Sequence, residues 1–233
     1  MSTQTQFCIR HTMFLCCSFI LLCIYSPVHG NLDLALIQPW ISSYGSFPWK
    51  HDWYLEVVNH RYVKNLIIAV LVSYLGLWIA SFKFSSLRAQ RGRYLYFFAV
   101  AVLSTIVIGL IKSQSDYACP WYMTTPTAHG FSWHFNNLNG HCFPGGHAAT
   151  GFCLIVGYFI YHIQQPKRAY FYLVAGLVLG FGMGWAQMMR GAHFLSHNLW
   201  TGWIIWAFNL LIYMLSYRKF KTAVFEIENK TSK

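Results

Sequence analysis

The chain has 233 residues, of which 56% are hydrophobic and only 10% are charged, and its formal net charge is +11. About a quarter of a typical soluble protein is charged, so this composition excludes an ordinary soluble domain and indicates a membrane protein. The positive charge does not indicate nucleic-acid binding, because the basic residues lie in short clusters between apolar runs. We therefore expect one integral-membrane domain over residues 1–233.

Six apolar stretches are long enough to cross a bilayer, whose hydrocarbon core of about 30 Å requires roughly 20 residues of helix. They predict an all-α, polytopic bundle with transmembrane helices at 7–25, 65–82, 94–111, 147–163, 169–189 and 198–216. The first stretch is also compatible with a cleaved signal peptide, because Arg10 and His11 precede a short hydrophobic run.

Lys and Arg are unevenly distributed between the two sides of this predicted bundle. Twelve lie on the side that would hold both termini and five on the other, so the positive-inside rule predicts that both termini are cytoplasmic. Residues 26–64, 112–146 and 190–197 are then outside, and 26–64 is expected to form an amphipathic segment near the interface. The expected location is a bacterial inner membrane, with these segments facing the periplasm or exterior.

Two of the seven cysteines, Cys119 and Cys142, fall in the outer segment 112–146. An oxidising compartment permits a disulfide between them, and two free thiols are the alternative. Zinc is not expected, because no Cys or His pair at zinc-finger spacing accompanies them. The sequence has no carboxylate cluster for another metal, so we expect no metal and no other cofactor.

Polar residues gather in two of the outer segments and at the adjoining helix ends. Those that can converge at one membrane face are Lys112, His147, Arg190, His193 and His197. Lys offers a phosphate a point charge and Arg offers it a planar fork, while backbone N–H groups at a helix start are further donors. Two histidines can divide the roles of nucleophile and general acid, because imidazole titrates near neutral pH. The pattern indicates phosphoryl transfer through a histidine.

The order of these residues resembles the type-2 phosphatidic acid phosphatase superfamily of membrane enzymes. The family pattern is Lys, six residues, Arg-Pro; then Pro-Ser-Gly-His; then Ser-Arg, five residues, His, three residues, Asp. The resemblance covers residues 112–203 by motif. It implies a metal-independent phosphatase that hydrolyses a lipid phosphate or diphosphate through a phosphohistidine.

In the first two motifs, the resemblance implies that Lys112 and the backbone of Gly145 and Gly146 bind the phosphate and that His147 is the general acid. Cys119 stands where the family has Arg, so one phosphate donor is missing, and a disulfide would give this position a structural role instead. Gly145 stands where the family has Ser, so a hydroxyl contact is lost.

In the third motif, His193 matches the nucleophile. The family's Arg falls on Gln187, and Arg190 lies three residues later on the same helical face, where it can reach the same phosphate. The Asp that orients the nucleophile falls on His197, which Asn198 follows. Neither residue is negatively charged at neutral pH, and either would stabilise an imidazolium less than a carboxylate does.

Asp116 is the one carboxylate in the segment between Lys112 and His147. It is a candidate for the missing relay acid, and an ordinary surface acid is the alternative.

Two other functions fit the same sequence. A phosphotransferase would hand the phosphoryl group to a second lipid, and a non-catalytic lipid-binding or transport protein fits the altered Arg, Ser and Asp positions. Four substrates remain open: undecaprenyl diphosphate, phosphatidylglycerol phosphate, phosphatidic acid and the phosphates of lipid A.

Overall fold

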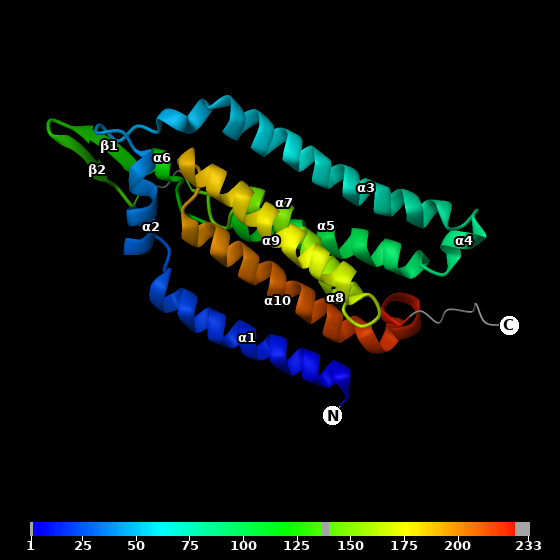
Figure 1. The fold of residues 1–233 in the computed structure, drawn as a ribbon. Helices are drawn as coiled ribbons and strands as arrows, with labels where there is room; N and C mark the ends of the chain where they lie inside the picture. Colours follow the sequence, from blue (N-terminus) through cyan, green and yellow to red (C-terminus); the bar gives the residue numbers. More distant parts are fainter. Residues whose placement is uncertain (1, 137–139, 227–233) are drawn as a thin grey trace.

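Long helices lying side by side make up most of the molecule (Figure 1). The computed structural model describes residues 2–136 and 140–226. Within this part of the chain, five helices are long and apolar enough to cross a membrane. They are α1 (Thr3–Tyr25), the helix Tyr54–Ala80 that includes α3 (Lys64–Ala80), α5 (Arg91–Ser113), α9 (Pro166–Met189), and the helix Leu195–Phe225 that includes α10 (Leu195–Phe220). The predicted all-α membrane bundle is confirmed.

A shorter apolar helix, Gly146–Tyr161, packs in the core and corresponds to the fourth predicted span. It consists of α7 (Gly146–Phe152), the 3-10 turn η4 (Cys153–Ile155) and α8 (Val156–Tyr161). Every residue from Gly151 to Tyr161 is buried, which explains why the sequence here is apolar on all sides. α7 approaches α9 closely, because a Cβ on Gly151 would overlap the backbone of Gly180.

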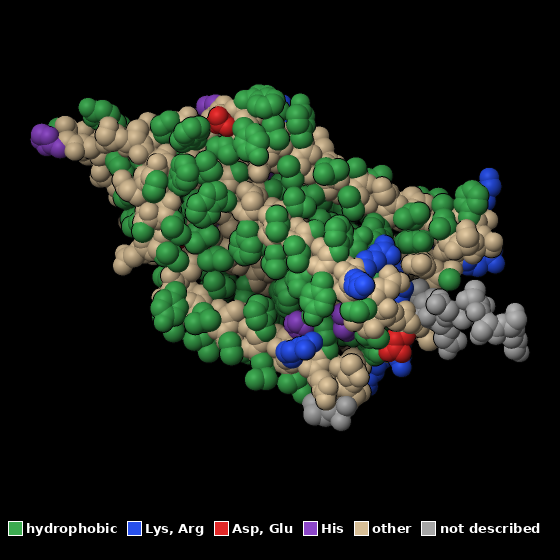
Figure 2. All heavy atoms as spheres, viewed as in Figure 1, with side chains coloured by type: hydrophobic (Ala, Val, Ile, Leu, Met, Phe, Trp, Pro, Cys, Tyr) green, Lys and Arg blue, Asp and Glu red, His purple; other side chains and the backbone are tan. Residues whose placement is uncertain are grey.

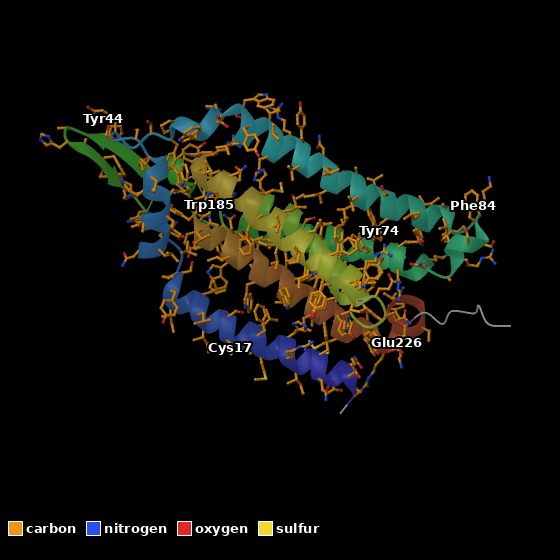
Figure 3. The ribbon with its side chains drawn as sticks, in the orientation of Figure 1. Cys17, Tyr44, Tyr74, Phe84, Trp185 and Glu226 are labelled. Carbon is orange, nitrogen blue, oxygen red and sulfur yellow. A yellow bond between two sulfur atoms is a disulfide. The ribbon has the colours of Figure 1, made fainter. Side chains whose placement is uncertain are left out.

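The two ends of the bundle differ in what they hold (Figure 1). α1 begins and α10 ends at one end, which we call the terminal end; it also holds α4 (Ser85–Arg88) and the π-helix η5 (Lys221–Phe225). The opposite end, the hairpin end, holds α2 (Asn31–Ile37), α6 (Pro120–Met123) and an antiparallel hairpin of β1 (Thr124–Thr127) and β2 (Gly130–Trp133). Tyr44 lies at the hairpin end, and Phe84 and Glu226 lie at the terminal end (Figure 3). The sequence did not predict the hairpin.

The segment between α1 and α3 folds into short helices at the hairpin end. After α2 come the 3-10 turns η1 (Gln38–Trp40) and η2 (Pro48–His51), and then the π-helix η3 (Tyr54–Val63), which runs directly into α3. The sequence predicted an outer segment up to residue 64 and a separate span from residue 65. The structure corrects this boundary, because main-chain hydrogen bonds continue the helix through polar residues that a hydropathy window rejects.

The sides of the bundle are covered by hydrophobic residues, and Lys and Arg gather near the terminal end on the face shown in Figure 2. Leu66, Val72, Val178 and Leu215 are each more than half exposed on the long helices. Such surfaces are unfavourable in water and suit contact with lipid chains. Their distribution agrees with a multi-pass membrane protein.

At the terminal end, two buried polar side chains, Arg93 and His162, have several hydrogen-bond partners. Arg93 is 2% exposed, and its Nε donates to the Val224 carbonyl at 2.6 Å while Nη2 donates to the Phe225 carbonyl at 3.2 Å. Nη2 also donates to the side chain of Gln164. These bonds attach the end of the described chain to α5.

His162, just after α8, is paired in the same way. Its Nδ1 lies 3.0 Å from the Phe159 carbonyl and its Nε2 lies 3.4 Å from the Tyr213 hydroxyl. The ring stacks on Phe7 with centroids 3.8 Å apart. Both nitrogens therefore have partners, as expected of a histidine that serves packing.

Candidate active site

A group of histidines and one lysine converges at the hairpin end, where α5 ends and where α7 and α10 begin. The ring centroids of His147 and His193 lie 6.3 Å apart, and those of His193 and His197 lie 5.7 Å apart. Lys112, in the last turn of α5, is within electrostatic range of all three rings. Its Nζ lies 3.8 Å from the point where a Cβ on Gly146 would stand. The structure thus brings together residues from three separate stretches of sequence.

A glycine turn at the end of α9 directs the nucleophile candidate into this group. Gly191 has φ +76°, a left-handed conformation that favours glycine and commonly ends a helix. The N–H groups of Ala192 and His193 both donate to the Gln187 carbonyl, at 2.9 and 3.3 Å. The chain therefore folds back over the end of α9, and His193 is left only 2% exposed.

The environment of His193 keeps its imidazole neutral. Burial, followed by the nearby Lys112, His197 and His147, holds the pKa of His193 well below its usual range. Its Nδ1 lies 3.4 Å from Nδ1 of His197. The backbone of Cys142 is a second hydrogen-bond partner of the His193 ring.

A disulfide between Cys119 and Cys142 closes the long segment before α7, with Cα atoms 5.2 Å apart. This confirms the predicted pairing. Cys142 also adjoins the rings of His193 and His197 through its backbone. The disulfide therefore fixes a stretch of main chain directly against the two histidines.

Asn198 serves the packing around Gly145. Its Nδ2 donates to the carbonyls of Gly184 and Phe194, at 3.0 and 3.2 Å. A Cβ on Gly145 would lie 2.5 Å from Asn198 Oδ1, so the two residues fit one another and leave no room for the family's Ser. The N–H of Gly145 already donates to the Thr201 hydroxyl at 2.8 Å, so it is not free to contact a phosphate as the sequence predicted.

Arg190 lies beside Gln187, as their spacing predicted, and each of its three nitrogens already has one partner in the protein. Nη1 donates to Gln187 Oε1 at 3.4 Å and Nε donates to the Lys50 carbonyl at 2.8 Å. Nη2 lies 3.4 Å from a carboxylate oxygen of Glu56. The guanidinium therefore joins the end of α9 to the segment before α3.

Comparison with known families identifies the chain. The model of the PAP2 superfamily matches residues 93–221, which is more than half of the sequence. The chain belongs to the PAP2 superfamily. It is therefore related to phosphatases that act on phosphate esters of lipids or small molecules. No match was found among curated proteins or among solved structures.

Two carboxylates of this PAP2 protein, Asp116 and Asp33, lie near the histidine group. In the described residues, no group of three or more His, Cys, Asp or Glu could hold a metal ion. Asp116 is exposed and lines a cavity of about 980 Å³ together with His29, Tyr117 and Phe143. The rings of His29 and Phe143 lie 6.2 and 5.5 Å from His197. Asp116 thus faces the cavity next to His197, and its role as relay acid stays a prediction.

Asp33, which lies before the PAP2 match, was missed by the sequence analysis. Its carboxylate accepts hydrogen bonds from the N–H and the hydroxyl of Ser196, at 2.8 and 2.5 Å, and from the His29 N–H at 3.0 Å. Phe194, the N-cap of α10, has no capping side chain, so Asp33 caps the helix from 163 residues away. Burial raises the pKa of Asp33, and the hydrogen bonds from Ser196 oppose this shift.

His60 on η3 was also missed. Its ring centroid lies 4.1 Å from that of His147, closer than any of the predicted histidines. No periodicity or motif links residue 60 to the PAP2 pattern, so only the fold reveals it.

An apolar cavity of about 620 Å³ lies where α1 faces α7, α9 and α10. Its lining includes Leu21, Leu32, Phe152, Leu177 and Trp203. Leu32 adjoins Asp33, so the cavity reaches the hairpin end of the bundle.

Proposed function

We propose that this PAP2 protein hydrolyses a lipid phosphate or diphosphate through a phosphohistidine formed on His193. The observation that carries the proposal is the grouping of two half-buried residues, Lys112 and His147, with a buried and neutral His193 at one end of a membrane bundle. A neutral imidazole has the free lone pair that attack on phosphorus requires. Lys112 supplies positive charge where the phosphate would bind.

In the first step, His193 attacks phosphorus, the bond from phosphorus to the lipid oxygen breaks, and His147 gives that oxygen its proton. Burial and the surrounding cations keep His147 neutral in the free protein, so it would take up this proton as the phosphate anion binds. The 6.3 Å between the ring centroids suits a phosphate between nucleophile and acid, because reacting atoms start about 3–3.5 Å apart. In the second step, His147 takes a proton from water as the water oxygen bonds to phosphorus. The bond from phosphorus to nitrogen then breaks and inorganic phosphate leaves.

His197 would orient His193 in the position where the family has Asp. Its Nδ1 contact with His193 fixes the ring without adding negative charge. Asp33 supports the same geometry indirectly, because it holds the first turn of α10 between the two histidines.

Two observations support an active site at the outer face of a bacterial inner membrane. Lys and Arg gather near the terminal end, including Lys83, Arg88, Arg218 and Lys219, and cytoplasmic loops carry such an excess. The hairpin end holds a disulfide, which persists in oxidising compartments. Both predict that the terminal end faces the cytoplasm.

The apolar cavity beside α1 supports a lipid substrate over a small soluble one. Its walls are aliphatic and aromatic, and it reaches the hairpin end at Leu32. A hydrocarbon chain held there would bring its phosphate to the level of the histidines.

The test is release of inorganic phosphate by the purified chain in detergent. Wild type and His193→Ala would each be given undecaprenyl diphosphate, phosphatidylglycerol phosphate, phosphatidic acid and lipid A. Wild type is expected to release phosphate from at least one lipid, and the variant is expected to lose roughly 10³-fold or more of kcat. Acid-labile radioactivity on the wild-type chain after a phosphate-labelled substrate would identify the phosphohistidine.

Other outcomes would redirect the proposal. Labelled phosphate that appears on a second lipid, with no free phosphate, would identify a phosphotransferase. A folded wild type that turns over none of the four lipids, or a His193→Ala variant that turns them over normally, would contradict the proposal.

A further inference from the structure

His60 lies in the histidine group although it comes from a part of the chain that the family match does not cover. It is carried by η3, the π-helix that continues into α3. Its ring is partly buried against His147, with the centroids 4.1 Å apart and the planes at 51°. π-helical turns often occur at functional sites. His60 therefore adds a fourth histidine to the group. It precedes His147 in the sequence, whereas His193 and His197 follow it.

The hydrogen bonding of His60 differs from that of a histidine that serves packing. Nδ1 of His60 is buried and has no hydrogen-bond partner among the described residues, and the same holds for Oδ1 of the neighbouring Asn59. His162, by contrast, has partners on both ring nitrogens. A buried polar atom without a partner costs free energy unless a ligand or water pairs with it. The geometry therefore leaves His60 able to bond to a ligand.

The site also lacks the cations that its family uses. Cys119 occupies one Arg position and forms a disulfide, and Gln187 occupies the other. Arg190, the expected replacement, is engaged by Glu56, Gln187 and the Lys50 carbonyl. Three of its five N–H donors are thus used within the protein, so a further donor from another residue would strengthen the binding of a phosphate beside Lys112 and His147.

The helix that carries His60 supplies positive charge at the same place. Lys64 follows His60 by four residues, so the two side chains leave the same face of the helix. Lys64 is within electrostatic range of both His60 and His147. The helix thus presents one histidine and one lysine toward the general acid.

We propose that His60 donates a hydrogen bond to a non-bridging oxygen of the substrate phosphate beside His147, in place of an arginine that the rest of the family uses. This inference rests on the proposed phosphatase function. It makes the helix Tyr54–Ala80 part of the substrate site, so that the family-matched residues would not bind phosphate fully on their own.

The experiment compares His60→Ala and His60→Gln with wild type in the full chain. Two measurements are made: kcat and KM for the best lipid substrate, and the Kd of inorganic phosphate from calorimetry. His60→Ala is expected to lower kcat/KM and to raise the phosphate Kd by roughly 10- to 100-fold, as for loss of a hydrogen bond to a charged group. His60→Gln keeps an N–H donor and is expected to recover part of both.

His162→Gln is the matched control, since it changes a buried histidine at the terminal end. It is expected to leave the phosphate Kd within twofold of wild type. Unchanged phosphate affinity and kcat/KM in a folded His60→Ala, or an equal loss in His162→Gln, would overturn the inference. If His60→Ala does not fold, His60→Gln and His60→Phe take its place, and equal phosphate affinity in these two would overturn it as well.

The two proposals fail in distinguishable ways. If the phosphatase proposal is wrong, the wild-type chain releases no phosphate, and the phosphate Kd of the His60 variants still tests whether His60 binds phosphate. If only the inference about His60 is wrong, the His60 variants bind phosphate normally and His193→Ala is still inactive.

Discussion

Arg93 and His162 at the terminal end differ from the histidine group at the hairpin end in how far the protein itself pairs their polar atoms. At the terminal end, Arg93 donates to three acceptors and His162 has a partner on each nitrogen. At the hairpin end, the described residues offer no partner to His147 Nδ1, His197 Nε2 or Gln187 Nε2. Folding alone explains the first set, because each group contributes hydrogen bonds to the native state. The second set fits the proposed phosphate site, because unpaired buried donors and acceptors are what a phosphate or water can use.

Among the substitutions that test this comparison, the largest loss of stability is expected for Arg93 at the terminal end. Arg93→Met removes the donor that serves the Val224 and Phe225 carbonyls and leaves them buried, so it is expected to cost about 3 kcal/mol of unfolding free energy. Activity per folded molecule is expected to stay near that of wild type. Denaturant unfolding in detergent and turnover of the folded fraction would check both.

Gln187→Met at the hairpin end is the matched control for Arg93→Met. Its Nε2 has no partner to lose, and its Oε1 loses one long contact, at 3.4 Å, with an Arg190 that keeps Glu56 and the Lys50 carbonyl. Stability is therefore expected to fall by about 1 kcal/mol, less than in Arg93→Met, while turnover falls. If both Met variants lose stability equally and keep activity, the distinction between the two ends is wrong.

The next effect concerns the contact between Gly145 and Asn198. Gly145→Ser, which restores the family residue, brings a Cβ to 2.5 Å from Asn198 Oδ1 and is expected to cost about 2 kcal/mol through overpacking. Adding Asn198→Ala removes the clash, so the double variant is expected to lose less than the two single losses together. Thermal unfolding of all four proteins measures this coupling, and strictly additive losses would show that the residues do not constrain each other.

A smaller effect is expected at Asp33. Asp33→Ala removes the cap of α10 and is expected to cost about 1 kcal/mol of stability. kcat is expected to fall more than KM rises, because His193 and His197 flank the released turn at Ser196. Asp33→Asn keeps one acceptor oxygen and should recover part of kcat; a variant with normal kcat and reduced stability would reduce Asp33 to a purely structural role.

The smallest effect is the pH dependence of stability. The pKa of His193 is held well below its usual range and that of His29 is lowered, so the unfolded chain takes up protons first as pH falls. Stability is therefore expected to decrease from about pH 7 to about pH 6, by at most roughly 0.7 kcal/mol for each histidine. The raised pKa of Asp33 acts in the opposite direction. Unfolding curves of His193→Gln should depend less on pH than those of wild type, and an equal slope would exclude His193 as a source.

Much of the bundle could be predicted because lipid contact leaves a direct mark on sequence. Apolar runs predicted the long helices, and two cysteines in one predicted outer segment indicated the disulfide. Lys112, His147 and His193 could be found because a family motif fixes their order. Their convergence follows from helix ends that meet at one membrane face.

The remainder depends on contacts that no local pattern records. Asp33 and Ser196 are 163 residues apart, and the polar stretch around His60 looked like an interfacial segment because hydropathy cannot detect a helix that continues through it. The ion pair between Arg190 and Glu56 could not be predicted either, because the two residues are far apart in the sequence. The spacing correctly placed Arg190 beside Gln187. It could not show that the guanidinium also contacts Glu56 and the Lys50 carbonyl, which lie before α3.

The cap that Asp33 gives to α10 joins a residue made early in synthesis to the last long helix. Ser196 can reach the Asp33 carboxylate only after the start of α10 has been made, so this cap is among the last contacts of the chain to form. A fragment cut at the limits of the family match would hold Lys112, His147, His193 and His197, but it would lack both Asp33 and His60.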